Sequence, residues 1–297
     1  MTGPVDGNAL AQDLTPHRED TAIDVLQDYQ NQGAEHCGRE IDLAAHAVAI
    51  LTTPEPQDKV VQTRLSAKLW RDSKIRVGSA QPPLRPARPA RPELRPPREM
   101  ARRRRGKSPA ARLALLHALA HIELNAVDLA WDIVARFTEE VLPDEFYSDW
   151  VAVAEDEARH FSLLSDRLSA FGGAYGDLPA HDGLWQAAEH TADDILARLA
   201  LVPMVLEARA LDVTPEMITR FNRYGDTESA NVLEVIYNDE IRHVANGSRW
   251  FHHICSDRGI NPTSTYHELV RRRYAGVLKQ PFNVPPTSAT RHAFRLM

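Results

Sequence analysis

A five-residue pattern that carries metal-binding side chains occurs twice in the sequence. Its copies are Asp-Glu-Ala-Arg-His at positions 156–160 and Asp-Glu-Ile-Arg-His at positions 239–243. On a helix, residues three positions apart lie about 60° apart around the axis, so the Glu and the His of each copy share one face. Each copy therefore predicts a helix that offers one carboxylate and one imidazole to a metal ion.

Each copy also follows an isolated Glu within an apolar helical stretch. Glu123 lies 34 residues before Glu157, and Glu207 lies 33 residues before Glu240. These near-equal offsets predict a duplicated helical hairpin that brings six metal ligands together: Glu123, Glu157, His160, Glu207, Glu240 and His243. A single Glu-x-x-His would more often be a solvated helix face. Four inward carboxylates without cations would be costly to bury, so the duplicated set favours two metal ions.

Three further residues are expected near the ligands without binding metal. Asp156 and Asp239 flank the ligand face, and metal-bound imidazoles usually donate their second N–H to a carboxylate. Our hypothesis is that the Asp of one copy orients the His of the other. Tyr237 lies one turn before Glu240 on the same face, so we expect it to border the site.

The order of the ligands resembles that of the ferritin-like di-iron or di-manganese carboxylate proteins. In that family, two helices of a four-helix bundle each give one Glu, and the other two each give Glu-x-x-His. The resemblance covers about residues 109–258. Within it, the segments AHIELNAVDLAWD, EDEARHF and YGDLPAHDGLW resemble a bacterial ferritin-like family of unassigned function, DUF455. Its more distant relatives include tRNA hydroxylases of the same fold.

The resemblance implies an all-α, ferritin-like bundle with two iron ions, or a Mn/Fe or Mn/Mn pair. Carboxylate and imidazole ligands suit both metals. It further implies an O2-activating oxidoreductase of hydroxylase or oxygenase type, with an external electron donor and an unknown small-molecule or macromolecular substrate. A non-catalytic iron-binding or ferroxidase protein and an RNA-modifying (tRNA) hydroxylase are the alternatives. No catalytic residue is assigned beyond the metal centre.

The composition is that of an ordinary globular protein, with 26% charged and 43% hydrophobic residues and a net charge of −6. No apolar run approaches the ~20 residues that span a bilayer, and the first residues lack the pattern of a signal peptide. We therefore expect a cytoplasmic protein without membrane contact. The two cysteines, Cys37 and Cys255, do not form a thiolate metal motif or a disulfide framework.

The chain is expected to have five parts. They are a disordered extension at 1–36, a helical hairpin at 37–81, a Pro/Arg-rich arm at 82–108, the bundle with a C-terminal helix at 109–279, and a tail at 280–297. Residues 82–109 hold eight prolines and ten basic residues, which excludes regular helix. We favour a linker that wraps the bundle; a nucleic-acid contact, densest at Arg102 to Arg105, is the alternative.

Helical periodicity and helix-end signals place the individual helices. The hairpin helices are expected at 40–52 and 55–70, and the bundle helices at about 108–137, 144–171, 184–211 and 226–256, with a short helix at 215–224. Pro203 lies inside the third bundle helix. Because proline has no N–H and a fixed φ, we expect a bend or bulge there.

Overall fold

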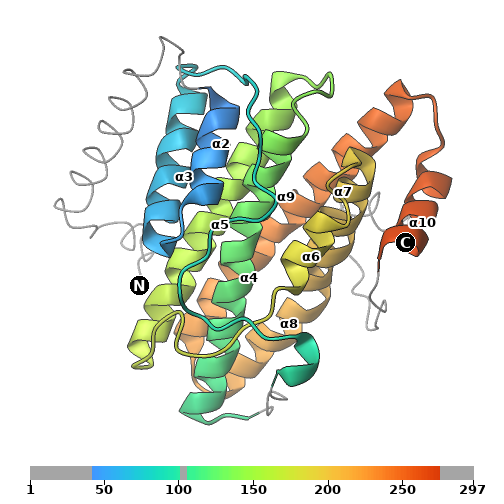
Figure 1. Cartoon of the computed structure of the whole chain (residues 1–297). Coiled ribbons are helices and arrows are strands. Elements are labelled where there is room, and N and C mark those ends of the chain that lie inside the picture. The colour runs from blue at the N-terminus through green and yellow to red at the C-terminus, as the bar shows by residue number, and fades with distance from the viewer. Residues whose placement is uncertain (1–41, 101–105, 275–297) are drawn as a thin grey trace, which may run out of the picture. The chain divides into compact units, whose positions relative to one another are not determined.

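The structure is a computed structural model that describes residues 42–100 and 106–274. Within these residues the regular elements are helices (Figure 1), apart from an isolated parallel bridge between Leu94 and Ala180. The all-α prediction is therefore confirmed. The predicted extension at 1–36 and the tail at 280–297 lie outside the described residues, as does Cys37.

Four long helical segments carry the predicted ligands. They are α4 (Pro109–Arg136), α5 (Asp144–Ala170), the continuous run of α7 (Ile195–Leu201), η2 (Val202–Glu207) and α8 (Ala208–Arg223), and α9 (Thr227–Asp257). Helix α4 packs against α5, α8 against α9, and α5 against α9 (Figure 1). Residues far apart in the sequence thereby face one shared interior.

Side-chain caps explain where two of these helices begin. The Ser108 hydroxyl accepts a hydrogen bond from the Ala111 N–H at 3.3 Å, and α4 then starts at Pro109, where a missing N–H is harmless. Similarly, the Asp226 carboxylate accepts from the Ser229 N–H at 3.2 Å at the start of α9. Caps of this kind satisfy N–H groups that lack a partner within the helix.

The prediction of one continuous third bundle helix at 184–211 is wrong. The structure has a separate α6 (Gly183–Glu189), then a turn, then α7. The break has a local cause, because the Asp194 carboxylate accepts from the Leu196 N–H at 2.9 Å and starts a new helix. The short helix predicted at 215–224 is also not separate, since α8 continues through Pro215. An internal proline bends a helix more readily than it ends one when the neighbouring turns remain helical.

The bulge predicted at Pro203 is present as the π-helical segment η2. A π-turn holds more residues per turn than an α-helix and is often found at functional sites. Helix α9 comes unusually close at this point, because a Cβ atom on Gly247 would lie 2.5 Å from the Cβ and Cγ atoms of Pro203. Glycine at position 247 thus permits the contact between η2 and α9.

The remaining helices pack around this interior. Helix α2 (Leu43–Thr52) lies along α4, and α3 (Pro56–Arg71) lies along α5 (Figure 1). Helix α10 (Pro262–Arg273) contacts α7 and α9. The buried apolar residues of all these helices form one main core.

The Pro/Arg-rich arm crosses the helices without regular helix over 79–96, followed by a short 3₁₀ turn, η1 (Pro97–Glu99). Its backbone is tied down at two points along this path. The Ala87 N–H donates to the Leu51 carbonyl, and the Arg95 N–H donates to the Ala180 carbonyl, both at 2.8 Å. This is the course of a wrapping linker. The cluster at Arg102 to Arg105 lies outside the described residues.

Helix α4 is long and apolar enough to cross a membrane by length and composition. However, 61% of its most apolar window is buried within the protein. It also carries fully buried acidic residues, Asp128 and Asp132, which form ion pairs inside the fold. These properties are typical of the core helix of a soluble protein.

Candidate metal centre

Six side chains from four helical segments converge in the interior. Glu123 comes from α4, Glu157 and His160 from α5, Glu207 from the end of η2, and Glu240 and His243 from α9. They form two groups, one of Glu123, Glu157, His160 and Glu240 and the other of Glu207, Glu240 and His243, in which the potential ligand atoms lie within 4.8 Å of one another. Each group is compact enough for one ion, and Glu240 belongs to both. The structure thus brings together all six residues named from the sequence.

Each histidine ring is held by an aspartate from the other copy of the motif. His160 Nε2 lies 3.0 Å from an oxygen of Asp239, and His243 Nε2 lies 3.2 Å from an oxygen of Asp156. An ionised aspartate can only accept, so each Nε2 carries the proton and donates it. The pairing is crosswise, as hypothesised, and leaves both Nδ1 atoms turned toward the glutamates.

The Nδ1 atoms approach carboxylate oxygens closely. His160 Nδ1 lies 3.1 Å from Glu123, and His243 Nδ1 lies 3.0 Å from Glu157. A neutral imidazole with its proton on Nε2 would direct a lone pair at these oxygens, which repel it. A proton or a metal ion between the two atoms makes the contact favourable. The geometry therefore requires a proton or a metal ion at each Nδ1.

Three of the four glutamates are difficult to ionise in this interior. Burial, with the charge of Glu157 adding to it, raises the pKa of Glu123 to about 8. Burial also raises the pKa of Glu207 to about 7, and it raises that of Glu240 well above its ordinary value. Buried carboxyl groups behave in this way when no cation compensates their charge. Bound cations would stabilise all of them as carboxylates.

In Glu157 and the two histidines, unlike the other three glutamates, the pKa shifts in the direction that favours the charged form. Burial acts to raise the pKa of Glu157, but its interactions with His160 and His243 outweigh burial and lower that pKa. Burial likewise acts to lower the pKa of each histidine, and the surrounding carboxylates outweigh it and raise both values. Glu157 is thus the carboxylate most strongly held in its charged form.

Several buried polar atoms of the centre have no hydrogen-bond partner within residues 42–100 and 106–274. They are both carboxylate oxygens of Glu157, one oxygen each of Glu207 and Glu240, and Nδ1 of His243. The 3.0 Å approach between His243 and Glu157 does not have the geometry of a hydrogen bond. Buried polar atoms are normally paired, and exceptions need an explanation. Because carboxylate oxygen and imidazole nitrogen are metal ligands, these residues fit a two-metal centre.

The arginines of the two motifs complete the outer side of the centre. Arg159 contacts Asp239 at 2.6 Å and Asp156 at 3.0 Å, while Arg242 contacts Asp156 at 2.6 Å and Asp239 at 3.2 Å. Burial acts to raise the pKa of Asp156, but His243 and Arg242 lower it to about 2. His243 and Arg242 together therefore keep Asp156 ionised, so that it accepts from the histidine.

A comparison with models of known protein families finds the family that the sequence segments resemble. The model of the DUF455 family, described as a protein of unknown function, matches residues 52–290. The chain belongs to the DUF455 family. The matched region contains all six candidate ligands of this DUF455 protein.

The chain is also similar to a curated protein. An uncharacterized protein of Haemophilus influenzae is 42% identical over 175 residues, which cover 57% of this chain and 61% of the relative. The match thus spans less than two thirds of the relative's length. No solved structure matches the chain.

Tyr237 packs against a small apolar cluster of Ala208, Leu211 and Val244. Two of these residues directly follow candidate ligands in the chain, Ala208 after Glu207 and Val244 after His243. That Tyr237 borders the ligands stays a prediction.

Sequence reasoning missed a buried ionic group beside the centre. Lys59 of α3 and Arg88 of the arm both form ion pairs with Asp128 of α4, and Arg88 also donates to Asn125 at 2.6 Å. Lys59 is 1% exposed and Asp128 is fully buried. The group ties the arm and α3 to the helix that carries Glu123. The sequence offers one signal, the position of Asp128 five residues after Glu123.

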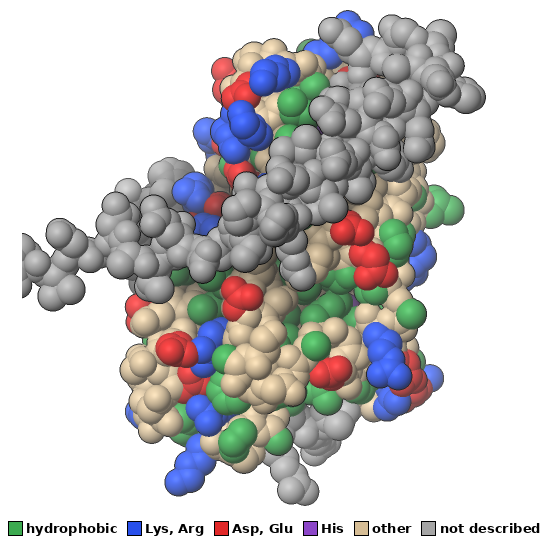
Figure 2. Space-filling model, turned by 90° about the vertical axis from the view of Figure 1, so that its left-hand side faces the viewer, with side chains coloured by type: hydrophobic (Ala, Val, Ile, Leu, Met, Phe, Trp, Pro, Cys, Tyr) green, Lys and Arg blue, Asp and Glu red, His purple; other side chains and the backbone are tan. Residues whose placement is uncertain are grey.

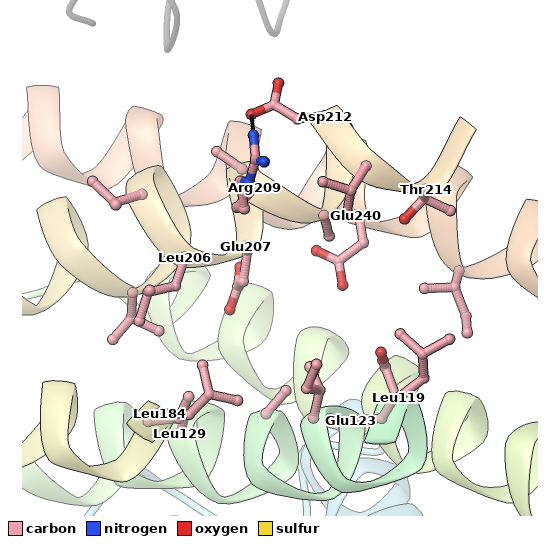
Figure 3. Close-up of a pocket in the computed structure, with 18 of the residues that line it drawn as sticks. Leu119, Glu123, Leu129, Leu184, Leu206, Glu207, Arg209, Asp212, Thr214 and Glu240 are labelled. Carbon is pink, nitrogen blue, oxygen red and sulfur yellow. Dashed lines mark hydrogen bonds and ion pairs between the residues drawn. The ribbon is translucent and has the colours of Figure 1, made fainter. Parts of the chain in front are cut away.

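A cavity of about 890 Å³ opens beside three of the carboxylates. Glu207 and Glu240 point into it, and Glu123 lies across from them on α4 (Figure 3). Glu157, His160 and His243 are not among its lining residues. The candidate centre of this DUF455 protein is therefore open toward a cavity on its carboxylate side and backed by aspartates and arginines on its histidine side.

Proposed function

We propose that this protein is a ferritin-like di-iron or di-manganese carboxylate protein that acts as an O2-dependent oxidoreductase of hydroxylase type. The observation that carries the proposal is the pair of buried ligand groups that share Glu240. Two divalent cations and four carboxylates balance in charge, which offsets the cost of burying the acids. When bound, such a metal pair supplies electrons and open coordination positions for O2.

The packing of the helices supports the ferritin-like part of the proposal. A single Glu, a Glu-x-x-His, a second single Glu and a second Glu-x-x-His come from successive long helical segments and face inward. This is the arrangement of ligands in ferritin-like carboxylate proteins. The duplicated motif then corresponds to two helical hairpins, α4 with α5 and the continuous α7–η2–α8 segment with α9.

The distances support a division of roles among the ligands. Glu123 and His160 would hold one ion, and Glu207 and His243 the other. Glu240 belongs to both groups. Glu157 places one oxygen 3.4 Å from His160 Nδ1 and the other 3.0 Å from His243 Nδ1. Glu157 and Glu240 are therefore the best candidates for bridging carboxylates.

The surrounding residues would position these ligands and admit the substrate. The crosswise aspartates hold Nε2–H of each histidine, so that each Nδ1 remains free for metal. The cavity at Glu123, Glu207 and Glu240 is large enough for an organic substrate, which favours an enzyme over an iron-storing protein. Hydroxylation would convert R–H and O2, with two electrons from an external donor and two protons, into R–OH and water.

The RNA-modifying alternative has less support among the described residues. Arg85 of the arm pairs with Asp182 and Glu189 of its own chain, and Arg88 pairs with Asp128. Acidic and basic side chains are interspersed over the described part of the face in Figure 2. Two of the described arginines of the arm, Arg85 and Arg88, thus already have carboxylate partners.

Metal analysis of the purified protein tests the proposal. Protein from iron- and manganese-supplemented cells should contain close to two of these ions per chain, and protein loaded anaerobically with ferrous ion should consume O2.

Variants of the candidate ligands test the same site. Glu157→Ala and His243→Ala should lower metal content without loss of helicity. Glu234→Ala, an exposed position on α9, is the matched control. Absence of metal after ferrous loading, a single zinc ion, or full metal retention in both variants would refute the proposal.

A further inference from the structure

We infer that the cavity beside the carboxylates binds an aliphatic chain and presents the buried end of that chain to Glu123, Glu207 and Glu240. The inference rests on the proposed function, because it names the class of substrate that the same site would accept. It follows from the lining of the cavity, its position between the helices and the side of the centre that it reaches.

Aliphatic side chains form most of the cavity wall. From α4 come Leu119, Ala126 and Leu129, and from η2 and α8 come Leu206, Ala210 and Met217. Leucines from both sides surround the space in front of Glu207 and Glu240 (Figure 3). The wall thus offers an apolar surface, and the three glutamates form its inner polar end.

Two of the other polar residues at the wall, Arg209 and Asp212, are paired with each other. Arg209 and Asp212 form an ion pair with each other at 3.2 Å and lie at the edge away from α4 (Figure 3). A sugar or nucleobase would lose hydrogen bonds to water wherever it lies against the aliphatic part of the wall, and that loss is costly. An aliphatic chain has no such groups to satisfy.

The arrangement of the helices explains why space exists here. Helices α4 and α5 pack closely, as do α8 and α9, while α4 and α8 face each other across the cavity. The π-helical segment η2 occupies the same seam and directs Glu207 into it. The volume of about 890 Å³ falls within the range of small-molecule sites. Ile122, on the cavity wall, is 37% exposed, so the apolar surface reaches solvent.

The position of the cavity determines which part of a bound chain would react. It touches Glu123, Glu207 and Glu240, whereas both histidines lie on the side closed by Asp156 and Asp239. A chain that enters between α4 and α8 therefore meets the centre from the carboxylate side. Its buried end would lie at the metal ions, and its other end would lie toward solvent.

Binding of alkyl probes to the metal-loaded, full-length protein tests this inference. Dansyl-labelled undecanoic acid should bind with increased fluorescence, and hexanol, octanol and decanol should displace it with affinities that rise about fourfold per methylene until the cavity is full. With manganese bound, the signals of the buried end of octanol should broaden in an NMR spectrum. Affinity independent of chain length, or equal displacement by a nucleoside, would overturn the inference.

Two cavity-filling variants locate the binding site. Ala126→Phe on α4 and Ala210→Phe on α8 narrow the cavity from opposite walls, and each should weaken probe binding at least tenfold while two metal ions remain bound. Thr219→Phe on the exposed face of α8 is the control and should bind the probe normally. Two variants are used because a single new phenylalanine side chain can turn away from the cavity and leave it open. Unchanged probe affinity in a correctly folded filling variant would overturn the inference.

The same measurements separate this inference from the function that it extends. Metal uptake without chain-length-dependent binding would keep the metal centre and reject an aliphatic substrate. Chain-length-dependent binding by a protein that takes up no metal would keep the apolar site and reject the oxidoreductase.

Discussion

The two histidines of the centre differ from ordinary buried histidines in having a carboxylate at each ring nitrogen. For His160 these are Asp239 at Nε2 and Glu123 at Nδ1. The aspartate fixes the proton on the outer nitrogen and turns the inner one toward the other acids. Each aspartate therefore acts on the centre indirectly, by holding its histidine in the tautomer whose Nδ1 can bind metal.

Asp239→Asn tests this role at the level of a single residue. An amide can donate to Nε2, which would move the ring proton to Nδ1 and oppose metal binding there. We expect metal affinity to fall about 10- to 100-fold with normal helicity. Chelator competition measures the dissociation constant, and Asp166→Asn, exposed on α5, is the matched control. Wild-type affinity in Asp239→Asn would show that the aspartate does not control the tautomer.

Among the helices, the contact between η2 and α9 has the strongest influence on the centre. Pro203 meets Gly247 four residues before Glu207 and four residues after His243. The positions of two ligands thus depend on one close approach between helices. A side chain at position 247 would have to push the two segments apart.

Gly247→Ala should therefore disturb the centre from outside it. The added methyl group would lie 2.5 Å from Pro203. Overpacking of this kind costs about 1–3 kcal/mol and would displace Glu207. We expect a lower free energy of unfolding in urea and a reduced metal content, while Asn246→Ala on the same helix should show neither effect. Normal metal content in Gly247→Ala would mean that the π-helical segment adapts without moving its glutamate.

The pairing of α2 with α3 should make the stability of the fold sensitive to acid. His46 on α2 lies 2.9 Å from the Ser66 hydroxyl on α3, and burial lowers its pKa from 6.5. As pH falls below about 6.5, the unfolded chain takes up a proton at this residue before the folded chain does. The contribution of His46 to stability is thus complete above that pH and is lost as pH falls toward the folded pKa.

His46→Gln should weaken this dependence. Urea unfolding of metal-depleted protein at pH 7 and pH 5 should show a smaller loss of free energy in the variant than in the wild type, because the variant has no proton to bind at this position. The protein is depleted of metal because acid would otherwise also protonate the metal ligands and release the ions, which would itself lower the stability. Equal losses in both proteins would assign the acid sensitivity to other groups.

At the scale of the whole molecule, a metal pair would link the two helical hairpins. Ions that bind only the folded chain stabilise it by about 2.7 kcal/mol per site at a concentration 100 times the dissociation constant. For a protein of this size each kcal/mol shifts Tm by roughly 2–4 °C. Chelation should therefore lower Tm by several degrees in the wild type and have little effect on Glu240→Ala, as measured by calorimetry. Equal shifts in both proteins would indicate metal bound elsewhere.

The sequence predicted best those features that depend on residues close together in the chain. Glu157 with His160, and Glu240 with His243, are fixed by helical spacing alone, and their duplication identified the other two glutamates. The break before α7 depends on the Asp194 cap, which a run of helix-forming residues conceals.

Interactions between distant segments were not predictable from local patterns. The ion pairs of Asp128 join three elements that are far apart in the sequence. The cavity depends on how far α4 lies from α8, which no local pattern records.

The crosswise aspartates have a consequence for how the two ions would be taken up. Asp156 is next to Glu157 on α5 but orients His243 of the second group, and Asp239 on α9 orients His160 of the first. An ion bound in either group would hold both helices in the position that the other group requires. The two binding events would therefore be positively cooperative, and a chain with one ion would be scarce beside chains with none or two.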